Sequence, residues 1–422
     1  MVVHRLLPKR RGNARSLTKR VSNGRRRPSR SLPVVPGHPL GGRIMMIRAL
    51  SVRVAGLACA VLTLGVASAP ATAAASGPRP KLGDVQQAMR SLAGTTGVVG
   101  AIGEVYVDGK RLGKGSAGSR LIDGKGGRIP SDSRYRIGSQ TKRLTAVVVL
   151  QLVKEGKIDL EDKLADLLPE VAEQDAVARA DEITVHQLLR HTSGIPNWFD
   201  AKLVDLYDFT TYYPPLDLVK MSRDQPRTGE PGAKYHYSNT NYTLLGLIIE
   251  KVAGRSLAAE FARRLFGPLG MSRSYLPARP PQGIKGPHGH GYHTDPQGGL
   301  RDMHRLNASY GNAAGGVIST ARDITRFHRA FVQGKLLPPA LQRVITDPQE
   351  GQPTQPPSER LCGGDPAFEV PSGGTAGFIA TTFTSSDGRL QFAVSTTTSV
   401  GSPLTISQAI NKAAETVLCP DK

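Results

Sequence analysis

The stretch Gly138-Ser139-Gln140-Thr141-Lys142 is followed by apolar residues at helical spacing, namely Leu144, Val147, Val148 and Leu152. This pattern predicts a buried helix that begins at the serine. Side chains three positions apart share a face of a helix, so the Ser139 hydroxyl and the Lys142 amine can meet there. The helix N-terminus also favours the negative charge that develops when a serine attacks. The stretch is therefore a candidate activated nucleophile.

The N-terminal 53 residues account for most of the formal net charge of the chain. They contain 14 Lys and Arg and no acidic residue, which leaves only +7 of the formal net charge of +21 for the rest. A second Ser-x-x-Lys match, Ser16 to Lys19, lies in this segment without an apolar helix behind it. The excess of Lys and Arg over Asp and Glu thus lies mainly in an N-terminal tail, and we expect no nucleic-acid partner.

Residues 45–75 have the pattern of an export signal. Arg48 and Arg53 precede an apolar run over 55–66, and small residues follow at 71–75, so we expect cleavage near Ala73 to Ala75. The apolar run is too short for a stable membrane span, which needs about 20 residues. Residues 1–44 would then be a basic extension produced by an over-extended start of translation, with a genuine nucleic-acid-binding or lipid-binding arm as the alternative. The protein is expected to be secreted.

Residues 76–422 read as one α+β domain in which helical and strand periods alternate. We expect helices over 82–92 and 404–417, a strand over 98–107, and a hairpin of strands over 381–384 and 390–394. The segment from about 159 to 299 has more helical patterns and loops. It therefore looks like an all-helical insertion beside an antiparallel sheet that the terminal helices flank.

A second chemical signal is Tyr237-Ser238-Asn239, which precedes an apolar helix over 242–249 that should end near Gly254. A phenol can transfer a proton and an amide can hold a substrate, so a loop docked on a buried helix could present both. Tyr310-Gly311-Asn312 has the same spacing. The Tyr-x-Asn pattern alone is therefore weak evidence for a functional site, and the order of the motifs along the chain is the stronger criterion.

The order Ser139-x-x-Lys142, Tyr237-x-Asn239 and Ser372-Gly373-Gly374 before a hairpin resembles that of serine penicillin-recognising enzymes. The chain is similar to the class C β-lactamase and D-alanyl-D-alanine carboxypeptidase family from about residue 82 to 419. Further stretches support the resemblance, among them Tyr135-Arg136-Ile137-Gly138, His191-Thr192-Ser193-Gly194-Ile195-Pro196 and Ala314-Gly315-Gly316. The resemblance implies an active site in a cleft between the sheet and the helices.

The resemblance also implies roles for the site residues. Ser139 would attack a carbonyl carbon and form an acyl-enzyme, Lys142 would assist its deprotonation, and Tyr237 would relay a proton to the leaving group. Asn239 would bind the substrate amide, while Ser372 and Gly373 lie on the strand that faces the serine. The backbone N–H groups of Ser139 and Gly374 would form the oxyanion hole.

The substrate expected from the resemblance is a small D-alanyl peptide of peptidoglycan or a β-lactam-like compound, and no cofactor is implied. Carboxypeptidase, β-lactamase and esterase activity stay open at this point, because side chains at the cleft rim decide between them. A second hypothesis is a non-catalytic relative that binds peptidoglycan fragments. We expect a monomer.

The third motif departs from the family pattern, which has lysine or histidine where this chain has Pro371. Proline offers neither a proton donor nor a positive charge. The group that attracts a substrate carboxylate or steadies the tyrosine is thus absent at this position. Arg360 and Arg389 are the candidates for a replacement, by sequence proximity.

Of the three cysteines, Cys59 lies in the expected signal and should be lost with it. Cys362 and Cys419 then form an even pair in an exported chain, so we predict a disulfide between them.

Two histidine patterns invite functional readings that we do not adopt. His288-Gly289-His290 with His293 could suggest a metal site, but no carboxylate or cysteine lies at ligand spacing, so we expect a solvated loop and no metal. His191 could be a catalytic base, but its place in the His191-Thr192-Ser193-Gly194 stretch is typical of a structural turn.

Overall fold

The computed structural model describes residues 80–199, 203–353 and 360–421. The predicted basic extension, the export signal and the second Ser-x-x-Lys match lie outside these ranges. Within them, none of the helices is both long and apolar enough to cross a membrane. The described residues form an α+β fold around an antiparallel sheet, which confirms the expected fold class.

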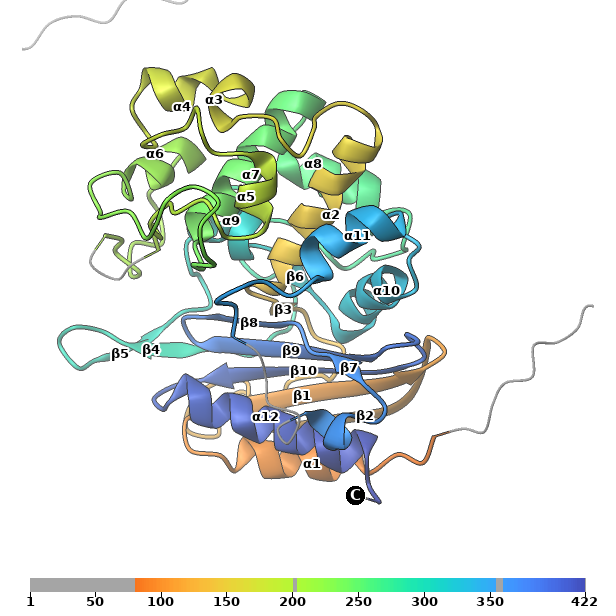
Figure 1. Cartoon of the computed structure of the whole chain (residues 1–422). Helices are drawn as coiled ribbons and strands as arrows, with labels where there is room; N and C mark the ends of the chain where they lie inside the picture. Colours follow the sequence, from red (N-terminus) through yellow and green to blue (C-terminus); the bar gives the residue numbers. More distant parts are fainter. Residues whose placement is uncertain (1–79, 200–202, 354–359, 422) are drawn as a thin grey trace, which may run out of the picture. The chain divides into compact units, whose positions relative to one another are not determined.

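The main sheet has six antiparallel strands (Figure 1), with the order β2-β1-β10-β9-β7 and with β8 also paired to β9. These strands are β1 (Val98–Val107), β2 (Lys110–Gly118), β7 (Phe368–Glu369), β8 (Ser372–Thr375), β9 (Phe378–Ser385) and β10 (Leu390–Thr398). Two short pairs lie outside it, β3 (Tyr135–Arg136) with β6 (Ile318–Ser319) and β4 (Tyr292–Thr294) with β5 (Leu300–Asp302). The predicted strand over 98–107 and the predicted hairpin are confirmed.

The two terminal helices, α1 (Val85–Ala93) and α12 (Pro403–Leu418), cover one face of the sheet (Figure 1). Because side chains alternate along a strand, β1 supplies both cores: Val105 packs with the terminal helices, and Ile102 faces the helical part. Residues 100–107 of β1 are accordingly all buried, and the one charged residue among them, Glu104, is paired with Arg111 at 2.8 Å.

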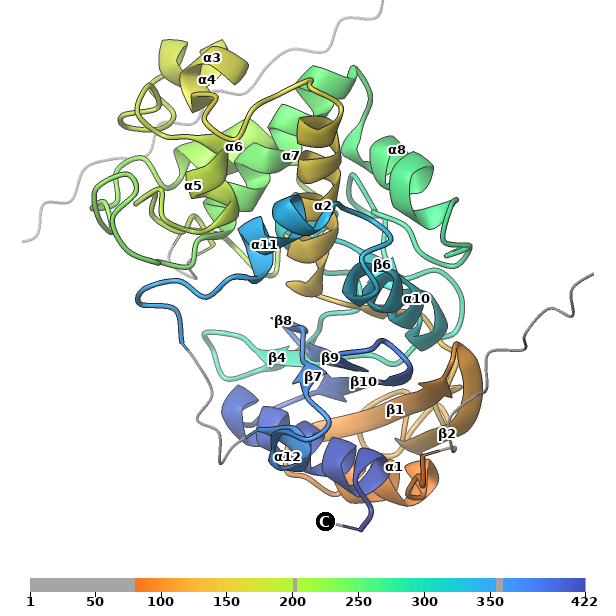
Figure 2. The same cartoon turned by 45° about the vertical axis from the view of Figure 1, so that its right-hand side comes forward.

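The helical part lies on the other face of the sheet (Figure 2). Its helices are α2 (Gln140–Lys154), α3 (Leu164–Leu167), α4 (Pro169–Glu173), α5 (Val185–Leu189), α6 (Pro215–Lys220), α7 (Asn239–Ala253), α8 (Leu257–Phe261), η1 (Ala262–Phe266), α9 (Ala308–Gly315), α10 (Ala321–Val332) and α11 (Pro339–Thr346). The helices thus begin before and continue after the expected insertion over 159–299, and β4 lies within that segment. The difference arises because α2, which precedes this segment, and α10, which follows it, are buried helices of the same core.

The N-terminal end of α2 is fixed to the sheet by Gln140. Its side-chain amide donates to the carbonyl of Ala380 on β9 at 3.1 Å, and its Oε1 accepts from Thr382 at 2.9 Å. The Gln140 side chain is itself buried, at 2% exposure, so its amide group needs these partners. These contacts hold the residue before Gln140 at the edge of the sheet.

The predicted disulfide between Cys362 and Cys419 is present, with the two Cα atoms 5.7 Å apart. Cys419 follows α12, so the bond ties the C-terminal helix to the segment that leads into β7.

Candidate active site

Four of the predicted site side chains meet at the N-terminal end of α2. The Ser139 Oγ lies 2.8 Å from the Tyr237 Oη and 3.3 Å from the Lys142 Nζ. The Lys142 Nζ also donates to the Asn239 Oδ1 at 2.7 Å. Residues about a hundred positions apart are therefore within direct hydrogen-bonding reach of one another.

Lys142 is buried without a carboxylate partner among the described residues. Its three acceptors, the Ser139 hydroxyl, the Asn239 side-chain carbonyl and the Ala314 backbone carbonyl at 2.8 Å, are all neutral. Burial therefore lowers the pKa of Lys142 to about 7. A substantial fraction of this amine is uncharged at neutral pH and can accept a proton.

Tyr237 lies on the other side of the serine, and its ring stacks on His191 with 4.7 Å between centroids. Burial raises the pKa of Tyr237 to about 12, so the phenol keeps its proton at neutral pH. Burial lowers the pKa of His191 to about 3, and its Nδ1 accepts a hydrogen bond from the Ser238 N–H at 3.2 Å. His191 is thus a neutral support for the tyrosine loop, as the sequence pattern suggested.

Glycines allow β8 to approach the serine closely. A Cβ atom on Gly373 would lie 2.1 Å from the Ile137 carbonyl oxygen and 2.5 Å from the Ser139 nitrogen. Gly138, with φ +53°, is equally close to Gly373 and Gly374. Only glycine fits at positions 138 and 373, and the backbone of Gly374 is thereby brought next to that of the serine.

Asn239 is oriented by a residue that the sequence patterns did not reveal. Its side-chain N–H and its backbone N–H both donate to the Asn197 Oδ1, at 3.1 and 3.0 Å. With its oxygen turned to Lys142, Asn239 has one side-chain N–H left for a substrate carbonyl. Asn197 directly follows the quoted stretch 191–196, but nothing in the residue type alone indicates this contact.

Ser139 lies between two cavities. The first, of about 660 Å³ including its open mouth, is lined by Ser139, Tyr237, Asn239, Gly374 and Arg136 together with residues 306–316. The second, of about 820 Å³, is lined by Ser139, Lys142, Tyr237, Pro371 and Ser372. A carbonyl group held at the serine could therefore extend one substituent into each cavity.

The missing cation at Pro371 is not replaced by either arginine proposed from the sequence, because neither Arg360 nor Arg389 lines the two cavities. Arg389 lies at the far turn between β9 and β10 and is paired with Asp108 at 3.0 Å. Arg143 does line the second cavity, but Glu369 neutralises it.

Arg136, in contrast, lines the first cavity without a carboxylate partner among the described residues. It is only 5% exposed, its Nη2 donates to the backbone carbonyls of His304 and Leu306, and its Nε has no partner. Burial lowers the pKa of Arg136 to about 10, so the guanidinium stays charged at neutral pH. Neither residue type nor spacing indicated that Arg136, a strand residue ahead of the main motif, lines this cavity.

The histidine loop differs from the sequence expectation in one respect. A carboxylate does lie close to it, because β5 pairs with β4 and brings Asp302 within 2.6 Å of the His290 Nδ1. His293 points elsewhere and contacts the Tyr207 hydroxyl at 2.8 Å. The prediction that no carboxylate lies at ligand spacing was therefore wrong. Spacing along the sequence does not show which residues a hairpin places opposite each other.

The comparisons with known proteins agree with this geometry. The family model described as Beta-lactamase matches residues 85–415. Penicillin-binding protein 4 of Amycolatopsis lactamdurans is 34% identical over 250 residues, which cover 57% of this chain and 61% of that protein. Esterase EstB of Burkholderia gladioli is 31% identical over 183 residues, which cover 41% of this chain and 46% of the esterase. The chain thus matches less than two thirds of the length of these two relatives.

Among solved structures, the D-stereospecific amidohydrolase from a Streptomyces species is similar over 80% of this chain and 98% of its own, with a TM-score of 0.68 and 29% sequence identity.

Proposed function

Since this chain belongs to the beta-lactamase family of serine hydrolases, we propose that it is an exported acyl-transfer enzyme that acts on D-alanyl-D-alanine peptides or related amides and esters. The proposal depends on one observation above all. Lys142 is buried with neutral partners only, 3.3 Å from the Ser139 Oγ. An unassisted serine hydroxyl is a poor nucleophile at neutral pH, and a neutral amine at this distance is the base that it needs.

In the first step the Ser139 hydroxyl gives its proton to the Lys142 Nζ while the Oγ forms a bond to the substrate carbonyl carbon. Tyr237 is the less suitable base, because a phenol with a pKa of about 12 is protonated at neutral pH. The carbonyl oxygen becomes an oxyanion. The backbone N–H groups of Ser139 and Gly374 are the candidate donors to it, each worth about 10²–10³ in rate.

In the second step the bond from the carbonyl carbon to the leaving group breaks. The Tyr237 O–H, 2.8 Å from the Ser139 Oγ, is placed to protonate the leaving nitrogen or oxygen, and Lys142 returns the proton to the phenol. Water then attacks the acyl-enzyme by the same steps in reverse, releases the acid and restores the serine.

Arg136 is the group that we propose for recognition of a substrate carboxylate. It is a buried cation on the wall of the first cavity, and its partners are two neutral carbonyls and the face of the Phe378 ring. A buried charge without a counter-ion attracts an anion strongly, because little water screens it. A free C-terminal carboxylate in this cavity would be the counter-ion that Arg136 lacks. Arg136 would thus bind the group for which Pro371 offers no positive charge.

The location of the substrate follows from the proposed export. A secreted hydrolase of this family would meet peptidoglycan, whose stem peptides end in D-alanine, outside the membrane. The pattern of residues 45–75 and the disulfide between Cys362 and Cys419 support export, because disulfides persist in oxidising compartments.

Labelling with a fluorescent penicillin tests the nucleophile. We expect the purified protein to form a covalent adduct whose mass equals protein plus reagent, and peptide mapping should locate it on Ser139. Ser139→Ala should form none, while Ser372→Ala, which changes a hydroxyl in the same cavity system, should still be labelled. An adduct in Ser139→Ala, or none in the wild type, would contradict the assignment.

An esterase without carboxylate recognition is the second candidate, and Pro371 is the observation that favours it. The hydrolase of D-alanyl-D-alanine peptides and the esterase are distinguished by the kcat/KM values for an acyl-D-alanyl-D-alanine and for its C-terminal amide. If Arg136 binds the carboxylate, the wild type should prefer the acid by about 10-fold or more in kcat/KM, mainly through KM, and Arg136→Met should lose this preference. Equal use of acid and amide by the wild type would favour the esterase. The ratio within each protein does not depend on how much of the variant is folded.

A further inference from the structure

A cluster of three histidines and one aspartate lies on one face of the β4–β5 hairpin, outside the serine site. In the pairing of these strands Tyr292 is opposite Asp302, and the Met303 N–H donates to the Gly291 carbonyl at 2.8 Å, so the same register continues to His290 and His304. Side chains alternate along a strand, so residues 290, 302 and 304 share a face. The local sequence thus builds the cluster without help from distant parts of the fold.

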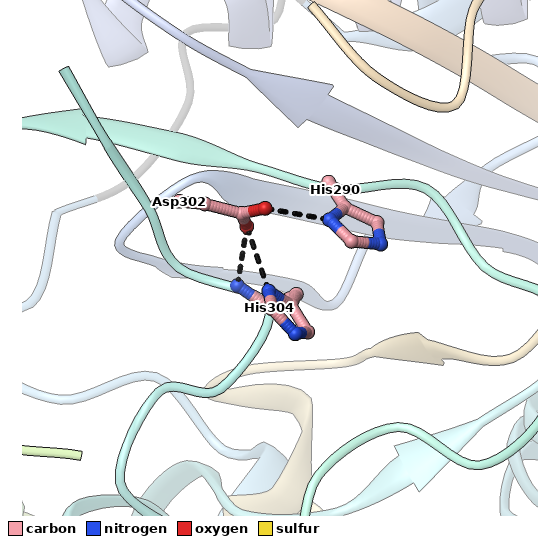
Figure 3. A group of neighbouring side chains, drawn as sticks. All are labelled: His290, Asp302 and His304. Atoms are coloured by element: carbon pink, nitrogen blue, oxygen red, sulfur yellow. Dashed lines mark hydrogen bonds and ion pairs between the residues drawn. The ribbon is translucent and has the colours of Figure 1, made fainter. Parts of the chain in front are cut away.

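The imidazole rings of His290 and His304 stack with 4.4 Å between centroids, and the Asp302 carboxylate lies beside them and contacts a nitrogen of each ring (Figure 3). Its Oδ2 is 2.6 Å from the His290 Nδ1, and its Oδ1 is 3.0 Å from the His304 Nδ1. The candidate ligand atoms of the three residues all lie within 4.8 Å of one another. Two nitrogen atoms and one carboxylate therefore already converge on one point.

Hydrogen bonding alone leaves this cluster incomplete. The Asp302 Oδ1 accepts the backbone N–H of His304 at 2.9 Å, and the His304 Nδ1, although close, is buried and makes no aligned hydrogen bond. The Nε2 of His288, whose ring stacks on His290 at 5.1 Å between centroids, is also buried without a partner. Buried ring nitrogens without partners are costly, and a bound cation would relieve the cost at His304.

From this geometry we propose that His290, Asp302 and His304 bind one Zn²⁺ ion. Two imidazoles with one carboxylate suit zinc, whereas Mg²⁺ and Ca²⁺ take sets of oxygen ligands. Zinc at its usual bond lengths of about 2.0–2.2 Å holds tetrahedral donors roughly 3.4 Å apart. To reach that arrangement, the two stacked rings have to turn toward a common point, and water would complete the coordination.

Zinc at this position would brace the wall of the first cavity. His304 is both a proposed ligand and, through its backbone carbonyl, an acceptor for Arg136 at 3.1 Å. Leu306 and Asn307, which follow directly, line the cavity. The ion would therefore tie the hairpin to the segment that holds Arg136, and we assign it a structural role and no step of the reaction.

Titration calorimetry with ZnSO₄ on untagged, chelator-treated and dialysed protein tests the proposal without using hydrolytic activity. We expect one Zn²⁺ per chain, with a dissociation constant in the micromolar range or below, and no binding of MgCl₂ at the same concentrations. His290→Ala and Asp302→Asn should each weaken zinc binding by at least about 10-fold.

The matched control is His293→Ala, which removes a histidine of the same hairpin that contacts Tyr207 and not the cluster. It should bind zinc like the wild type, and zinc should raise the Tm of both but not that of Asp302→Asn. Absence of zinc binding by the wild type would overturn the proposal whether or not any variant folds. Equal affinity of Asp302→Asn and the wild type, or equal losses in His293→Ala and His290→Ala, would overturn it as well.

Discussion

A buried cation lies at each end of α2, Lys142 on the helix itself and Arg264 on η1, and the two cations have opposite surroundings. At the N-terminal end, Lys142 touches only neutral oxygen atoms, and burial lowers its pKa to about 7. Just past the C-terminal end, Glu155 binds Arg264, whose side chain is 4% exposed and also contacts Glu260 at 2.6 Å. These carboxylates raise the pKa of Arg264, Glu155 first.

The difference between the two ends teaches what a counter-ion decides. A buried cation with carboxylates keeps its proton and ties elements together, here α2, α8 and η1. A buried lysine without them, as at Lys142, gives its proton up readily and becomes a base, whereas the guanidinium of Arg136 stays charged at neutral pH under similar burial. The helix is therefore reactive at one end and rigid at the other.

The largest effect should come from Lys142→Met, which removes the base and keeps most of the side-chain volume. Acylation of Ser139 should slow by about 10³-fold, within the range for loss of a general base. The free energy of unfolding should not fall, because the variant no longer buries a cation without a counter-ion. Stopped-flow labelling and urea unfolding measure the two quantities. If Lys142→Met is destabilised but is labelled at the wild-type rate, Lys142 stabilises the fold and is not the base.

Arg264→Met should have the opposite profile. It leaves the fully buried Glu260 without its buried partner, so the free energy of unfolding should fall by about 3 kcal/mol or more, while folded protein labels at the wild-type rate. Arg223→Met is the matched control. It breaks an ion pair with Asp175 that is mostly exposed and should cost less than about 1 kcal/mol in urea unfolding. Equal losses of unfolding free energy in the two variants would show that the buried Arg264 contributes no more to stability than an ion pair at the surface.

Tyr237→Phe should sharpen the description of the reactive end. It removes the proton donor but leaves the ring stacked on His191 and Lys142 in place. We expect acylation by an amide to fall by about 10²-fold, and acylation by an activated ester, whose leaving group needs no proton, to fall much less. Equal losses for both substrates would argue against a role as proton donor.

Acid should lower the contribution of the rigid end to stability. Arg264 lowers the pKa of Glu155 to about 2 from its usual 4.5, so this carboxylate stabilises the fold above about pH 4.5. The contribution is lost as the pH falls from 4.5 towards 2, since the unfolded chain then binds the proton more readily. Urea unfolding at several pH values should show a steeper loss for the wild type than for Arg264→Met.

Patterns within short segments predicted the frame of the molecule and the centre of its site. The predicted strand over 98–107 is β1, and Gly254, with φ +63°, ends α7 where the sequence indicated. The convergence of Ser139, Lys142 and Tyr237 was expected from a resemblance, and their distances are consistent with it.

Contacts between distant segments could not be predicted in this way. Glu155 and Arg264 are 109 positions apart, and neither residue type nor spacing indicates their pairing. The surroundings of Arg136 depend on carbonyl groups almost 170 positions away. The aspartate of the histidine cluster was missed because the histidine stretch was predicted to be a solvated loop, and spacing along the sequence does not show that a hairpin brings Asp302 back to it.

The most direct test of the account is the pH dependence of Ser139 acylation in the wild type and in Lys142→Met. The neutral amine is the base and predominates above its pKa of about 7, so the second-order rate constant of the wild type should rise with pH, reach half its plateau near that pKa, and level off about one pH unit above it. The variant should lack this inflection. A wild-type profile without an inflection near pH 7, or the same inflection in Lys142→Met, would contradict the claim that Lys142 is the base.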